Sequence, residues 1–151
     1  MTKLLSHLVS TLLLLAAFGL AAQAKPDLII SRVEVTRDAS GSFVQKVLVT
    51  VTNGCREATA GTSYVLITFK QNEQRDARAI YFVGNTVKAL RGGESQTQAF
   101  DVSSEKIGFG RYVYVEADPY RKITEASEDN NWRTLFPDGA GTVLSQSQCT
   151  P

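Results

Sequence analysis

The sequence contains very little histidine, cysteine, tryptophan or methionine: among 151 residues there are one His, two Cys, one Trp and one Met. The single histidine, His7, falls in an N-terminal segment that we expect to be removed, so the remaining chain has no histidine. Histidine is the usual base of hydrolase triads and a common ligand of zinc and iron. Its absence excludes most sites of those kinds.

Long hydrophobic runs are also absent after the first 24 residues, which themselves predict an export signal. Lys3 gives a basic start, an apolar run extends from Leu8 to Ala22, and Ala22-Gln23-Ala24 is typical of a cleavage site. We expect cleavage, with the mature chain beginning at Lys25. The alternative, an uncleaved membrane anchor, is disfavoured because a spanning helix needs roughly 20 apolar residues. We therefore expect a secreted or periplasmic protein with no stable membrane insertion after cleavage.

An excess of charge of either sign is missing as well. Lys3 is the only charged residue of the signal segment, which leaves 15 basic and 15 acidic residues among the 127 that follow. This balance gives no support for nucleic acid as a partner. The length suits one domain. In an oxidising compartment the pair Cys55 and Cys149 predicts an intramolecular disulfide, with a free Cys149 or pairing between chains as the alternatives.

From Asp27 onward the sequence shows short alternating β-branched runs separated by Gly, Asn and Asp, without helical periodicity. These runs predict strands at residues 28–36, 43–52, 65–69, 79–83, 97–102, 112–117 and 132–136. Gly84-Asn85 is expected to end the fourth, and a change of phase after Ile30 predicts a bulge or a change of sheet in the first. Seven short strands predict an all-β, immunoglobulin-like sandwich of two antiparallel sheets over residues 25–136, followed by a flexible tail over residues 137–151.

Four segments in this order resemble the CARDB family, the cell-adhesion-related domain found in bacteria. They are Pro26-Asp27-Leu28-Ile29-Ile30, Val49-Thr-Val-Thr-Asn53-Gly54, Leu90-Arg-Gly-Gly93-Glu-Ser, and Val115-Glu-Ala-Asp118-Pro-Tyr with Glu125-Ala-Ser-Glu128-Asp129-Asn130-Asn131. Cys55 departs from the glycine or small residue that the family commonly has there. The resemblance implies an immunoglobulin-like fold and a non-catalytic, adhesion-type binding role toward a protein or glycan of the cell envelope or extracellular space.

The acidic and amide-rich segment after Val115 has two interpretations. In the structural one, Asp118 starts a tight turn and the amides near residue 130 satisfy backbone groups. In the functional one, hard oxygen ligands gather around calcium; they would come from Asp118, Glu125, Glu128, Asp129 and Asn130. The structural role is the commoner one for Asp and Asn, so calcium is the alternative and no other cofactor is expected.

Aromatic residues near the same segment form a second candidate site. Tyr112, Tyr114 and Tyr120, with Arg121 and Trp132, are of the types enriched in recognition surfaces. In the alternative interpretation the tyrosines shield a sheet face while their hydroxyls stay hydrated, and Trp132 packs at the margin of the core.

Enzymatic activity is the remote third alternative. A glycoside hydrolase would need two facing carboxylates, for which the candidates are Glu116, Glu125 and Glu128. No motif sets two of them opposite one another, so we expect no enzyme.

Overall fold

The structure is a computed structural model that describes residues 24–135 and residue 149. The predicted signal segment up to residue 23 and the predicted tail, Cys149 excepted, lie outside the described residues. Within the described ranges, none of the helical structure is long and apolar enough to cross a membrane.

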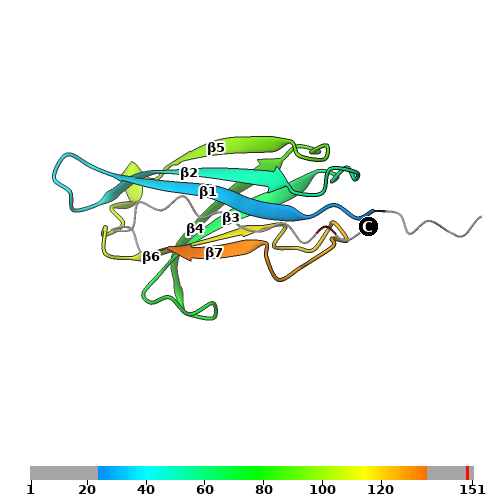
Figure 1. Cartoon of the computed structure of the whole chain (residues 1–151). Coiled ribbons are helices and arrows are strands. Elements are labelled where there is room, and N and C mark those ends of the chain that lie inside the picture. The colour runs from blue at the N-terminus through cyan, green and yellow to red at the C-terminus, as the bar shows by residue number, and fades with distance from the viewer. Residues whose placement is uncertain (1–23, 136–148, 150–151) are drawn as a thin grey trace, which may run out of the picture.

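Seven strands form two antiparallel sheets that pack face to face (Figure 1). The first sheet has the order β1–β2–β5, with strands Leu28–Arg37, Val44–Asn53 and Ser95–Asp101. The second has the order β4–β3–β6–β7, with strands Ala79–Val87, Ser63–Lys70, Tyr112–Ala117 and Trp132–Leu135. A 3-10 turn, η1 (Ser103–Glu105), is the one helical element among the described residues. The predicted all-β, immunoglobulin-like sandwich is confirmed.

The core lies between the sheets and is formed by the alternate residues that the sequence pattern assigns to it. A strand directs successive side chains to opposite faces, so every second residue of a central strand faces the other sheet. These inward residues are at most 1% exposed: Val47, Val49 and Val51 of β2, Val65, Ile67 and Phe69 of β3, and Val113, Val115 and Ala117 of β6.

Strand β1 contains the predicted irregularity. Its pairing with β2 shifts register between Ile30 and Arg32, and both Ile30 and Val33 are buried. The bulge lets side chains on either side of the slip face the core despite the change of phase.

The predicted end of β4 at Gly84-Asn85 is wrong, because the strand continues to Val87. Gly84 pairs with Leu66 inside the ladder. A Cβ on Gly84 would lie 2.4 Å from Tyr64 Cε1 and 2.6 Å from the Val65 carbonyl oxygen. Glycine is therefore required here by close packing inside a strand rather than by a turn.

Three segments that are distant in the sequence meet at one end of the sandwich, which we call the polar corner: residues 26–28, 53–60 and 118–131. The Gly54 N–H donates to the Asp27 carbonyl at 2.8 Å, and the Ala126 N–H donates to the Pro26 carbonyl at 2.8 Å. The start of β1 is thereby fixed between the other two segments, at the end of the molecule where Cys149 also lies (Figure 1).

Candidate functional site

Asp27 is a fully buried carboxylate in the polar corner. Asn130 Nδ2 donates to both of its oxygens, at 3.0 and 3.1 Å. Asn53 Oδ1 accepts from the backbone N–H of Asp27 at 3.1 Å and from that of Cys55 at 3.2 Å. One buried amide therefore fixes Asp27 relative to Cys55.

Glu125 is the second buried carboxylate of the corner, with 5% of its surface exposed. It accepts hydrogen bonds from the Leu28 N–H and, at 2.8 Å, from Asn131 Nδ2. Burial, helped by the nearby charges of Glu128 and Asp118, raises the pKa of Glu125 to about 8, although these two hydrogen bonds oppose the shift. This carboxyl group is accordingly held mostly protonated at neutral pH.

Asp118 begins a tight turn, as the structural interpretation predicts. Its backbone is left-handed, with φ of +45°, a conformation that Asp tolerates better than most residues. Its carbonyl accepts from the Arg121 N–H at 2.9 Å, and its Oδ2 accepts from the Ile123 N–H at 2.7 Å. The carboxylate thus holds the loop that follows.

Among the described residues, the four carboxylates of the predicted calcium site do not gather around one point. The carboxylates of Asp118 and Glu125 accept backbone N–H groups, Glu128 accepts from the Glu125 N–H at 3.4 Å, and Asp129 is exposed. Over the part of the chain that the structure describes, the one group of three or more acidic or thiol ligands close enough to share an ion is a different one, Asp27 with Cys55 and Cys149.

Three oxygens of the corner are nevertheless buried without a hydrogen-bond partner: Asp118 Oδ1, Asn130 Oδ1 and Asn131 Oδ1. Buried acceptors of this kind are normally satisfied by protein, water or an ion. These three oxygens of the polar corner could therefore still accept hydrogen bonds or coordinate a cation.

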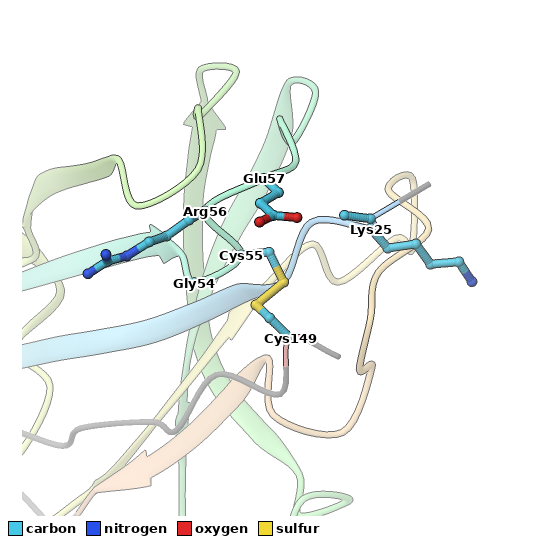
Figure 2. Close-up of a pocket in the computed structure, with 7 residues that line it drawn as sticks. Lys25, Gly54, Cys55, Arg56, Glu57 and Cys149 are labelled. Carbon is cyan, nitrogen blue, oxygen red and sulfur yellow. A yellow bond between two sulfur atoms is a disulfide. The ribbon is translucent and has the colours of Figure 1, made fainter. Parts of the chain in front are cut away.

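The predicted disulfide between Cys55 and Cys149 is present, with the two Cα atoms 5.3 Å apart. It lies beside an open pocket of about 400 Å³. Figure 2 shows Lys25, Glu57 and Arg56 around it, with the Arg56 side chain pointing away from the sulfurs. Sequence reasoning predicted the disulfide but did not predict that the Asp27 carboxylate lies beside it. The only sequence signal for Asp27 is its position as an acidic residue directly before an apolar strand.

The aromatic candidates divide into a buried pair and exposed residues. Tyr114 is only 3% exposed, because its ring stacks on Trp132 with centroids 5.7 Å apart and Lys70 Nζ lies 4.0 Å from its ring centre. Burial raises the pKa of the Tyr114 hydroxyl to about 12, and the charge of Glu116 adds to the effect. The Tyr114 hydroxyl is buried rather than hydrated, and Tyr114 is not part of an exposed stripe.

Tyr120 is 63% exposed, with its ring centre 5.8 Å from that of Tyr64. Arg121 is also exposed. Tyr112 is half-buried and pairs with Lys70 in the ladder between β3 and β6. Tyr120 and Arg121 thus lie on the loop after β6, whereas Tyr112 lies at the start of that strand.

Sequence reasoning missed two exposed apolar residues on β4, Ile80 and Phe82, which are 47% and 67% exposed. Phe82 pairs with Thr68, and Thr68 pairs with Tyr114. Side chains of directly paired residues lie on the same side of a sheet. Phe82 therefore shares the outward face of the β4–β3–β6–β7 sheet with Tyr114; we call this surface the outward face. The sequence signal that could have revealed these exposed residues is the alternation of Ile80 and Phe82 with Tyr81 and Val83.

The glutamates considered for glycoside hydrolysis occupy different places. Glu116 lies on β6 and pairs with Arg75 at 3.0 Å, whereas Glu125 and Glu128 belong to the polar corner. A hydrolytic pair that includes Glu116 gains no support from this arrangement.

Comparison with known proteins identifies a family and a solved structure of similar fold. The model of the CARDB family matches residues 25–135. An NMR structure of a domain assigned to a cell surface protein of Methanosarcina acetivorans is similar with a TM-score of 0.55 and 19% identity, over 74% of this chain and 89% of that one.

Two crystal structures of a β-glucosidase from Kluyveromyces marxianus, one with glucose bound, align with 74% of this chain but only 14% of theirs. Their identities are 16% and 15% and their TM-scores 0.39 and 0.37, too low to indicate a shared fold. No curated protein matches the sequence.

Proposed function

Because this chain belongs to the CARDB family, we propose that it is an exported, non-catalytic interaction module that binds a protein or glycan outside the cytoplasm. Three observations support the proposal: the family itself, the similarity in fold to a domain assigned to a cell surface protein, and a disulfide of the kind that persists in oxidising compartments. Secretion or residence in the periplasm follows from the same proposal.

The observation that carries the choice of surface is the exposure of Phe82 on the outward face and of Ile80 on the same strand, with Tyr120 at 63% exposure on the loop after β6. Exposed aromatic groups on a rigid support are the usual anchors of recognition surfaces, because they bury a large area at a small cost in conformational entropy. The stack of Tyr114 and Trp132 provides a rigid base in the same sheet.

The test compares binding of the wild-type protein with that of a Phe82→Ser/Tyr120→Ser double variant. Probes are a glycan array and isolated cell-envelope fractions. The matched control is Phe43→Ser, which removes an aromatic residue that is 38% exposed and precedes a strand of the other sheet. We expect the double variant to lose at least about tenfold in affinity, as for removal of a hot spot, with its melting temperature and the binding of the control unchanged. Equal binding by wild type and double variant would refute the choice of surface.

A second proposal is that the polar corner binds calcium. It is supported by the three buried oxygens of Asp118, Asn130 and Asn131 that have no partner, since calcium is bound by carboxylate and amide oxygens. Millimolar calcium should then raise the melting temperature relative to excess chelator, by mass action. The rise should vanish in Asp118→Asn and persist in Asp38→Asn, a control at the opposite end of β1. No response of the wild type would leave the corner as a purely structural network.

A further inference from the structure

Asp27, Cys55 and Cys149 form a compact set of potential ligands. One carboxylate oxygen of Asp27 and the two sulfurs all lie within 4.8 Å of one another. Asp27 is fully buried and Cys55 is 3% exposed, whereas Cys149 is exposed. While the disulfide is intact neither sulfur can bind an ion, so any role of this set in metal binding belongs to the reduced protein.

Reduction converts the set into two thiols next to a buried carboxylate. Thiolates formed there would be disfavoured, because their negative charges would repel that of the carboxylate. A divalent cation reverses that balance, since it attracts all three anionic groups. Two sulfurs and one oxygen match the ligands that zinc takes in proteins.

We propose that Cys55 and Cys149, once reduced, bind one Zn²⁺ ion together with Asp27, so that the pair forms either a disulfide or a metal site. Tetrahedral zinc with Zn–S of about 2.3 Å and Zn–O of about 2.0 Å requires ligand atoms about 3.5–3.8 Å apart. Movements of roughly 1 Å from the present spacing reach this geometry once the bond between the sulfurs has opened. The two cysteine Cα atoms, 5.3 Å apart, allow both side chains to reach one ion.

Hydrogen bonds from the surroundings hold the Asp27 carboxylate and the backbone of Cys55. Asn130 Nδ2 donates to the Asp27 carboxylate at 3.0 and 3.1 Å, the kind of outer contact that orients a carboxylate ligand. Asn53 Oδ1 binds the backbone N–H groups of both Asp27 and Cys55, and the Gly54 N–H donates to the Asp27 carbonyl. The Asp27 carboxylate and the Cys55 backbone are therefore held by hydrogen bonds that do not involve the disulfide.

The pocket beside the disulfide supplies an access route and a fourth ligand. It has a volume of about 400 Å³, is open to solvent, and has both cysteines among its lining residues (Figure 2). Three protein ligands with one position open to water is a common arrangement for zinc. Water from the pocket would complete the tetrahedron.

A phosphine can reduce the disulfide between Cys55 and Cys149. The phosphine and one water become phosphine oxide while the disulfide gains two electrons and two protons, which gives two thiols. Zn²⁺ then displaces both thiol protons to the solvent and bonds to the two sulfurs and to the ionised carboxylate, which gives a site of net charge −1. Two protons are released for each zinc bound, so apparent affinity should rise with pH.

The test measures zinc binding by the full-length protein after anaerobic reduction with a phosphine, using a competing chromogenic chelator. We expect one zinc per reduced chain and none per oxidised chain. Cobalt added in place of zinc should show sulfur-to-metal charge-transfer absorption. Asp27→Asn keeps the size of the side chain and should weaken zinc binding by at least about tenfold. The matched control is Glu57→Gln, which removes an acid from the same pocket outside the ligand set and should bind zinc as the wild type does.

Several results would overturn the proposal. Zinc binding by the reduced protein no tighter than by Cys149→Ser would exclude the thiol pair, and Asp27→Asn binding as tightly as wild type would exclude the carboxylate. If reduction unfolds the chain, zinc should restore the circular dichroism of the β-sandwich and raise the melting temperature, because binding free energy then becomes folding free energy. Failure of zinc to restore the fold would also refute the site.

Discussion

Replacement of Glu125 by glutamine tests the account of the polar corner most directly. Glu125 is 5% exposed and accepts hydrogen bonds from the Leu28 N–H and Asn131 Nδ2. In the variant, a 180° rotation of the Asn131 amide would present its Oδ1, which has no partner, to the new NH₂ group. Glu125→Gln should therefore keep the hydrogen bonds of the protonated wild type while removing its titration.

The sign of the effect follows from the raised pKa. The pKa of Glu125 is about 8 in the folded protein against an ordinary value of 4.5. Between these values the folded state holds a proton that the unfolded state has released, so the free energy of unfolding falls as pH rises from about 4.5 to about 8. The stabilisation is complete below this interval and lost above it. At about 1.36 kcal/mol per unit, the difference corresponds to a loss on the order of 5 kcal/mol.

Urea unfolding at intervals between pH 4.5 and 8.5 measures this slope. We expect wild-type stability to fall across the interval and the stability of Glu125→Gln to stay nearly flat. The two proteins should be equal at the acid end, and the variant more stable at the alkaline end. Asp129→Asn, which changes an exposed acid in the same loop, is the matched control and should keep the wild-type slope. A wild-type stability that is constant or rises with pH, or a slope that persists in Glu125→Gln, would refute the reasoning.

Three further predictions concern the stability of the sandwich. Cys149→Ser removes the disulfide between residues that are 94 positions apart. On the chain-entropy model it should lower the free energy of unfolding by about 4–5 kcal/mol, measured by urea unfolding. A loss below about 1 kcal/mol would contradict this prediction. Gly84→Ala forces a Cβ to within 2.4 Å of the Tyr64 ring and should cost about 1–3 kcal/mol, whereas Gly110→Ala, with nothing within 4 Å, should not lower the melting temperature by packing conflict. Phe69→Ala empties a fully buried site and should cost about 3–5 kcal/mol in the same assay; a near-neutral result would show that the core can collapse around the cavity.

The strands and their buried faces follow from the sequence because alternation is a local property. Val113, Val115 and Ala117 are all fully buried, and the phase change after Ile30 marks the register shift of β1. Alternation does not reveal which side chains cover the outward face of a sheet. Tyr114 lies on the outward face as predicted, yet it is buried by Trp132 and by Lys70 from a strand more than forty positions earlier.

Sequence reasoning located one of the three segments of the polar corner, residues 118–131, but not its contacts. The bond from the Leu28 N–H to Glu125 joins residues 97 positions apart, and that from Asn130 to Asp27 joins residues 103 apart. Carboxylates and amides close together in sequence are compatible with a turn, with a metal site or with long-range hydrogen bonds, because each needs only oxygen and N–H groups. Only the packing of the first strand against the last loop distinguishes these roles.

On the function that we propose, stability and recognition belong to different parts of the molecule. Glu125, Asp27 and the disulfide lie in the polar corner, where burial makes their hydrogen bonds and charges matter for folding. Phe82 is 67% exposed on an edge strand, where its replacement removes little buried area. Changes at separate sites that share no partner usually add in their effects on stability. Loss of binding by a variant of the outward face that keeps the wild-type melting temperature would therefore report recognition itself rather than damage to the corner.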